Sequence, residues 1–187
     1  MSADLDKQMK LAEELMDKAI EHLVHELSKV RTGKANPSMV QELKVNYYGN
    51  PTPLNQVANV GLADSRTITV QPWEKSMLGP IEKAVFEANL GLTPINDGDL
   101  IRISVPPLTE ERRKDLVKQA KAMGEEGKVA VRNIRHKTLD IIKKAVKDGV
   151  PEDIGKKKET QLQEKVNQHV DKIDKMIKSK DDEIMKV

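Results

Sequence analysis

The sequence has no cysteine and no long hydrophobic run. Without cysteine the chain cannot form a disulfide framework, a thiolate zinc site or a cysteine nucleophile, and this fits a reducing compartment. No stretch approaches the roughly 20 apolar residues that a membrane-spanning helix needs, and the opening "MSADLDKQMK" lacks the basic and apolar regions of a signal peptide. We therefore expect a cytoplasmic protein that contacts no membrane.

Aromatic residues are scarce as well. The 187-residue chain has two tyrosines, one tryptophan and one phenylalanine, and all four fall between the helical segments: Tyr47, Tyr48, Trp73 and Phe86. A small sheet domain needs its few large residues for a core, so we expect these four to be buried. The alternative is a platform on which nucleic-acid bases stack.

Charge, in contrast, is abundant and unevenly placed. Charged residues make up 33% of the chain, yet the net charge is only +2. Residues 106–147 carry twelve basic and six acidic residues, whereas the segments on either side are neutral or acidic. One segment therefore holds the positive charge, and such a segment can form a surface for phosphate groups.

Three segments have the three- and four-residue spacing of apolar side chains that predicts amphipathic helices. The first begins near Leu5, the second near Leu116 and the third near Val166. A helix from about Glu110 to Lys147 would be roughly 57 Å long and would need packing partners to be stable. We predict an antiparallel three-helix bundle formed by residues 1–30 and 106–187.

Between the first two helices the hydrophobic period falls to two. The stretches "LKVNYY", "NQVANV", "RTITVQP" and "LIRISV" predict short strands, a helix is expected over 77–88, and turns are expected at 49–53 and 96–99. The fold class is therefore α+β, with residues 31–105 forming a small β/α/β domain inserted into the bundle.

Two short segments join the predicted domains, near 31–33 and 104–107. The two prolines of the second segment cannot donate to a sheet and disfavour a helical conformation before them, so the strand ends before the helix begins. We expect both segments to act as hinges of limited freedom. The hinge residues are Arg31, Thr32 and Gly33 in the first segment and Val105, Pro106 and Pro107 in the second.

A basic stripe follows the long helix. Each of its members stands two positions, or about 200°, before a residue of the expected apolar seam, so the stripe should face away from the core. An ordinary solvated face accounts for the pattern alone equally well, but the local excess of positive charge favours folded RNA bound through its phosphates. The stripe consists of Lys114, Lys118, Lys121, Lys128, Arg132 and Arg135.

The sequence gives little support to an enzyme. "TGKA" at residues 32–35 lacks the earlier glycine and the following serine or threonine of a phosphate-binding loop. His22 and His25 share a helix face, but no third metal ligand accompanies them. We expect no catalytic residues, no metal site and no cofactor.

Six stretches, in order, resemble the signatures of the ribosome recycling factor family. They are "VRTGKANPS" at 30–38, "YYGNPTPLNQVANV" at 47–60, "DSRTITVQPW" at 64–73, "EKAVFEANLGLTP" at 82–94, "PPLTEERRKDLVK" at 106–118 and "VAVRNIR" at 129–135. The resemblance covers essentially the whole chain. It implies an L-shaped protein with a three-helix bundle and a β/α/β domain.

The resemblance also implies a function. Such a factor binds the large ribosomal subunit across the A and P sites after termination, and elongation factor G with GTP then separates the subunits. It implies that Arg132 is the principal contact to ribosomal RNA and that Arg135 and Lys128 support it. From the basic stripe we add Lys121 and Lys118 to these expected RNA contacts. We expect the protein to be a monomer. The family usually has a second arginine where this chain has His136.

A different class of protein fits the helical pattern equally well. A coiled-coil adaptor or oligomerising scaffold without RNA binding would also have long heptads and high charge. Such a protein would self-associate, and it would not bind ribosomal subunits in a salt-sensitive way.

Overall fold

The computed structural model describes residues 2–186 and separates them into two compact units. One unit contains the chain up to Thr32 and from Glu110 onward, and the other contains Gly33–Thr109. The α+β fold class, with a helical bundle interrupted by a small sheet unit, is confirmed.

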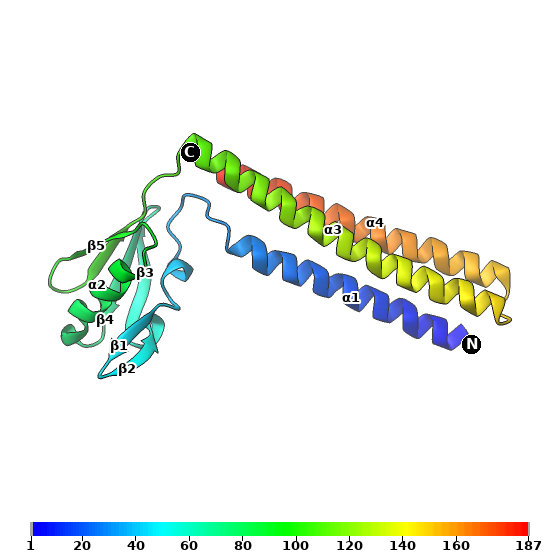
Figure 1. Cartoon of the computed structure of the whole chain (residues 1–187), viewed down its shortest axis with the longest axis horizontal. Coiled ribbons are helices and arrows are strands. Elements are labelled where there is room, and N and C mark those ends of the chain that lie inside the picture. Colours follow the sequence, from blue (N-terminus) through cyan, green and yellow to red (C-terminus); the bar gives the residue numbers. More distant parts are fainter. Residues whose placement is uncertain (1, 187) are drawn as a thin grey trace. The chain divides into compact units, whose positions relative to one another are not determined.

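The first unit consists of three long helices that lie side by side (Figure 1). They are α1 (Ser2–Ser28), α3 (Glu110–Lys147) and α4 (Glu152–Met185). Their buried seams contain mostly aliphatic side chains, with small residues where helices approach closely. The bundle core includes Leu5, Met9, Met16, Leu23, Leu116, Val131, Ile142, Leu162, Val166, Ile173 and Ile184.

Ion pairs between helices follow the heptad and define the register. Lys158 pairs with Asp6, and seven residues later in each helix Lys165 Nζ lies 2.7 Å from Glu13 Oε2. The constant offset means that α1 and α4 run parallel. One turn further, buried His169 contacts Asp17 through Nε2 at 2.7 Å. The helix α3 runs antiparallel to both.

The boundaries of α3 follow from local chemistry. Glu110 and Glu111 occupy its first turn, where the helix dipole favours negative charge, and Lys144 and Lys147 occupy its last turn. Gly149, with φ of +116°, then reverses the chain before α4.

The second unit is built on a four-stranded antiparallel sheet with the order β3-β4-β6-β5, beside a separate β1–β2 hairpin. One helix, α2 (Leu78–Glu87), contacts β1 and β5. The core of this second unit is aliphatic and includes Val40, Leu54, Ile68, Val70, Ile81, Ile101 and Ile103. The strands are β1 (Lys44–Tyr47), β2 (Asn50–Pro53), β3 (Ala58–Asp64), β4 (Thr67–Pro72), β5 (Thr93–Asn96) and β6 (Ile101–Ser104).

Two of these strands differ from the sequence-based expectation. The segment predicted as a turn at 49–53 is strand β2, and the turn itself lies at Tyr48 and Gly49, which have φ of +48° and +86°. The strand β5, with Pro94 inside it, was not predicted. Proline is tolerated in both because β2 and β5 are edge strands.

The expectation that the aromatic residues form the core of this unit is wrong. Trp73 is 62% exposed, Tyr48 73% and Phe86 76%. Tyr47 is half-buried, and both tyrosine hydroxyls donate to the Glu74 carboxylate, at 2.9 and 2.7 Å. Valine, leucine and isoleucine fill the core instead.

Candidate nucleic-acid interface

The buried face of α3 is rotated from the predicted seam. Its buried residues include Gly124, Val131 and Thr138, none of which belonged to the predicted apolar pattern. Lys121 and Arg132 each follow a buried residue by one position, and Lys128 and Arg135 follow one by four. These steps correspond to about 100° and 40° around the helix. These four residues therefore flank the seam beside α4, and the prediction that they face directly away from the core is wrong.

Because it lies beside the seam, Lys128 is paired with a carboxylate of α4. Its ammonium lies 2.5 Å from Asp174 Oδ1 on α4 and 3.5 Å from Glu125 Oε1 on its own helix. The hydrogen bond to Asp174 raises the pKa of Lys128 above its ordinary value. The side chain is largely covered, so Lys128 joins two helices as well as adding positive charge to the surface.

Arg135 and Lys121 also contact α4. The Nε–H of partly buried Arg135 donates to Gln163 Oε1 at 2.8 Å. Lys121 Nζ lies 4.0 Å from Asp181 Oδ2, although most of its side chain is exposed. Three of the five residues predicted to bind RNA therefore also hold the α3–α4 register.

Arg132 and Lys118 are exposed on the surface of α3. His136 is exposed as well. Two further exposed cations, Lys143 and Lys147, continue the same flank three and four turns beyond Arg132. The sequence-based prediction did not include them, although the eleven-residue step from Arg132 to Lys143 returns to nearly the same helix face and the fifteen-residue step to Lys147 turns by only about 60°.

The predicted hinge residues lie in different surroundings. Arg31, Thr32 and Gly33 are partly buried, and Gly33 has φ of +82°. Val105 is buried in the core of the small unit and donates its backbone N–H to Arg66 O at 2.8 Å, whereas Pro106 is exposed.

Residues 2–186 hold no group of three or more His, Cys, Asp or Glu side chains placed to bind a metal ion. Over the same residues, no helix is both long and apolar enough to cross a bilayer.

A helical bundle with an inserted sheet unit and a cationic flank on its longest helix defines a two-domain binding protein built around a charged surface. The family model described as ribosome recycling factor matches residues 23–185. The chain belongs to this family, and it is a translation factor that acts in ribosome recycling and not an enzyme.

Relatives and solved structures of this family match the chain over almost its whole length. The ribosome-recycling factor of Trichlorobacter lovleyi is 51% identical over 92% of this chain and 94% of its own, and that of Flavobacterium johnsoniae is 48% identical over 100% of both chains. A solution structure of the ribosome recycling factor is 36% identical, with a TM-score of 0.77 over 98% of both chains. A Thermus thermophilus factor, described with Escherichia coli elongation factor G on the post-termination complex, is 44% identical, with a TM-score of 0.63 over 97% of this chain and 98% of its own.

Proposed function

We propose that this chain binds the large ribosomal subunit across the A and P sites and, with elongation factor G and GTP, separates the subunits after termination. Support comes from the T. thermophilus relative, which is described as bound with elongation factor G to the post-termination complex. Ribosomes work in the cytoplasm, and we place this protein there as a monomer. The adaptor or scaffold alternative is set aside because the chain belongs to a family of recycling factors.

The ribosomal RNA contact in this proposal is the exposed cationic flank of α3. The observation that carries it is the exposure of Arg132 within the most basic segment of the chain. A guanidinium in such a position can bind a phosphate through two parallel hydrogen bonds. Lys118, Lys143 and Lys147 extend the flank, while Lys121, Lys128 and Arg135 add positive charge from the α4 side.

The two connecting segments are proposed to be hinges. Val105 is packed in the core of the small unit, so the second pivot in this proposal lies after it, between Pro106 and Glu110. The first lies at Arg31–Gly33, where Gly33 tolerates a backbone conformation that other residues adopt rarely.

The test is binding of purified large subunits by the Arg132→Ala protein across a salt series. We expect a loss of about 1–3 kcal/mol in binding and a salt slope lower by about one, because one phosphate contact disappears. Lys172→Ala, which removes an exposed lysine of α4, is the matched control and should retain wild-type binding.

Thermal melts separate binding from folding. Arg132→Ala should melt like the wild type because its side chain is exposed. Lys128→Ala should lower the melting temperature, since it leaves Asp174 without its α3 partner. Wild-type affinity and salt slope in Arg132→Ala would refute the proposed surface.

A further inference from the structure

A hollow of about 820 Å³ lies in the small unit, between the β1–β2 hairpin and one flank of α2. Such a volume falls within the roughly 300–1,000 Å³ that is typical of ligand pockets. The hairpin wall includes the consecutive residues 43–46 and therefore follows the backbone of β1. The helix wall includes the small residues Gly79, Pro80, Ala84 and Ala88, which leave space beside β1. We call this hollow the β1–α2 hollow.

The register of the hairpin shows which backbone groups of β1 point away from β2. The N–H of Leu54 donates to the carbonyl oxygen of Leu43 at 2.9 Å, so Leu43 directs its backbone groups toward the second strand of the hairpin. Alternate residues of an antiparallel strand direct their N–H and C=O groups to opposite sides. Val45 therefore also faces β2, whereas Lys44 and Asn46 face away from it. Since β1 pairs with β2 alone among the described strands, the outward backbone groups of Lys44 and Asn46 are free to bind a ligand in the hollow.

Two other sheet edges of the small unit are blocked by proline. By the same alternation, the outward positions of β2 are Pro51 and Pro53, which have no N–H group. In the turn between β5 and β6, the N–H of Asp97 donates to Leu100 O, and this places Pro94 at an outward position of β5. Proline at such positions prevents a further strand from pairing. The strand β1 contains no proline, so its outer edge can accept a strand.

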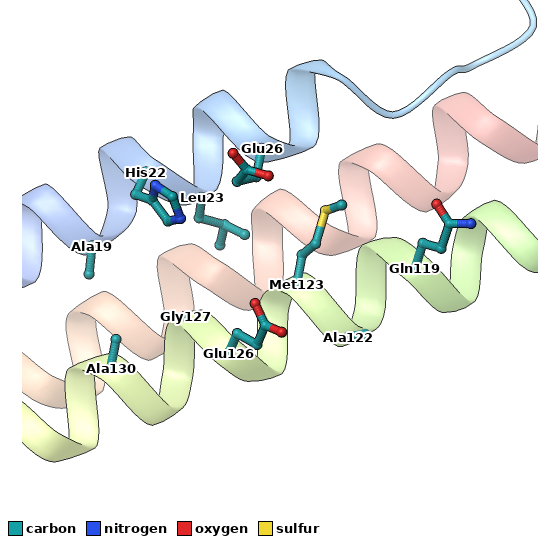
Figure 2. A pocket seen from close by; sticks show the side chains of 10 residues that line it. All are labelled: Ala19, His22, Leu23, Glu26, Gln119, Ala122, Met123, Glu126, Gly127 and Ala130. Atoms are coloured by element: carbon teal, nitrogen blue, oxygen red, sulfur yellow. The ribbon is translucent and has the colours of Figure 1, made fainter.

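A hollow between α1 and α3 differs in this respect. Figure 2 shows its lining residues, which run from Ala19 to Glu26 on α1 and from Gln119 to Ala130 on α3 and all lie within the helices. Backbone groups inside a helix bond one another along the helix axis, so the hollow in Figure 2 offers a ligand only side chains. The β1–α2 hollow, in contrast, offers main-chain donors and acceptors as well.

We propose that the β1–α2 hollow binds an extended segment of a partner protein, which pairs with β1 as an added antiparallel strand. The antiparallel direction is the slightly more stable of the two. Residues 43–46 span roughly 10 Å of extended chain, so about four residues of the partner pair directly. Main-chain hydrogen bonds provide affinity, and side chains provide specificity. This site belongs to the small unit and is additional to the proposed RNA contact on α3.

The side chains of β1 define the chemistry of this partner segment. Val45 is buried in the core of the small unit, whereas Lys44 and Asn46 are exposed on the opposite face of the strand. Residues that stand directly opposite each other in paired strands share a face, so the segment should alternate apolar and polar residues. Lys83 and Glu87 on the helix wall pair with each other at 3.8 Å, whereas Lys44 forms no ion pair within the described residues. The polar residue opposite Lys44 should therefore be acidic.

The test uses the full-length protein and a fluorescein-labelled seven-residue peptide of alternating glutamate and valine. Fluorescence anisotropy should show saturable binding. In the antiparallel arrangement the glutamates stand opposite Lys44 and Asn46, so their N–H groups face β1. Methylation of the glutamate nitrogens removes these donors and should weaken binding at least about tenfold, whereas methylation of the valine nitrogens should have much less effect. No saturable binding, or an equal or greater loss on valine methylation, would overturn the proposal.

A charge exchange locates the polar side of the partner segment. Lys44→Glu places a like charge opposite the glutamates and should weaken binding about threefold. A peptide with lysine in place of glutamate should show the reverse order and bind Lys44→Glu more tightly than the wild type. Lys172→Glu, which reverses an exposed lysine of α4, is the matched control and should bind both peptides like the wild type. An equal loss in Lys44→Glu and Lys172→Glu would contradict the proposed site.

Amide hydrogen exchange identifies the edge itself. Saturation with the unmodified peptide should slow exchange at the outward amides of Lys44 and Asn46, while the amide of Val45, which faces β2 in the free protein, should change little. Unchanged exchange at Lys44 and Asn46 in the saturated complex would exclude β1 as the strand that binds the peptide.

Discussion

Asp181 on α4 is a carboxylate in an unfavourable position. Its Oδ1 is buried and accepts no hydrogen bond within the part of the chain that the structure describes, and Lys121 lies 4.0 Å from its other oxygen. Burial raises the pKa of Asp181, and the nearby Lys121 only partly offsets this effect. Since the raised pKa means that the ionised form is disfavoured in the folded state, this group costs stability at neutral pH.

We therefore expect Asp181→Asn to stabilise the bundle at pH 7, by up to about 1 kcal/mol. The folded pKa lies above the unfolded one, so the wild type recovers this stability as the pH falls. The difference should vanish near pH 3, where the carboxyl group is protonated in both states. Urea denaturation at both pH values measures it. An advantage of the variant that persists unchanged at pH 3 would contradict this cause.

Individual side chains were the least predictable part of the molecule. The sequence could predict that positive charge gathers on α3, because basic residues accumulate in one segment. It could not predict that Lys128 and Arg135 contact α4. Their contacts depend on Asp174 and Gln163, which lie in another helix. The aromatic residues were misjudged for a related reason, since aliphatic side chains from several strands already fill the core of the small unit.

At the scale of the elements, the spacing between α3 and α4 depends on glycine. A Cβ atom on Gly124 would lie 2.6 Å from Cγ1 and 2.9 Å from Cδ1 of Ile177. A Cβ atom on Gly127 would lie 3.3 Å from Leu23 Cδ2, the end of a flexible side chain. The two glycines occupy the same helix, so alanine gains about 1 kcal/mol of helix propensity at either.

The two alanine variants should therefore differ by the cost of overpacking. We expect Gly127→Ala to be neutral or stabilising and Gly124→Ala to be less stable than it by about 1–3 kcal/mol. Thermal and urea unfolding compare them directly. In an Ile177→Ala background the colliding atoms are gone, and Gly124→Ala should then stabilise the bundle. A Gly124→Ala protein as stable as Gly127→Ala would refute the close contact.

The existence of most elements could be predicted from the period of the hydrophobic pattern. All three long helices and α2 were anticipated, because a 3.6-residue period sustained over many residues is typical of a helix and not of a strand. The strands β2 and β5 were not, because each is four residues long and contains proline. Local sequence does not show that a strand will lie at a sheet edge, where proline is tolerated.

At the scale of the whole molecule, the connection between the two units is the testable feature. Two glycines inserted between Thr109 and Glu110 lengthen this connection at the boundary of the units. We expect the melting temperature to change little and subunit splitting with elongation factor G to fall several-fold, because a restricted hinge would no longer limit the motion.

A length control uses two glycines placed after Gly98, in the exposed turn between β5 and β6. That protein should split ribosomes normally. Light scattering of ribosomes measures splitting for both proteins. Normal splitting by the first variant would mean that the hinge does not transmit force.

The two units also differ in how their chain segments are ordered. The small unit is one continuous segment, residues 33–109. The bundle core, in contrast, combines α1, which the ribosome makes first, with residues as late in the chain as Ile184. Buried Arg113 donates from Nη1 to the carbonyl oxygens of Met185 and Lys186, so even the end of α4 takes part in closing the bundle. During synthesis, α1 must therefore wait with its apolar seam uncovered while the small unit folds. A nascent copy therefore completes the bundle that carries the proposed RNA contact only after the translating ribosome has made α4.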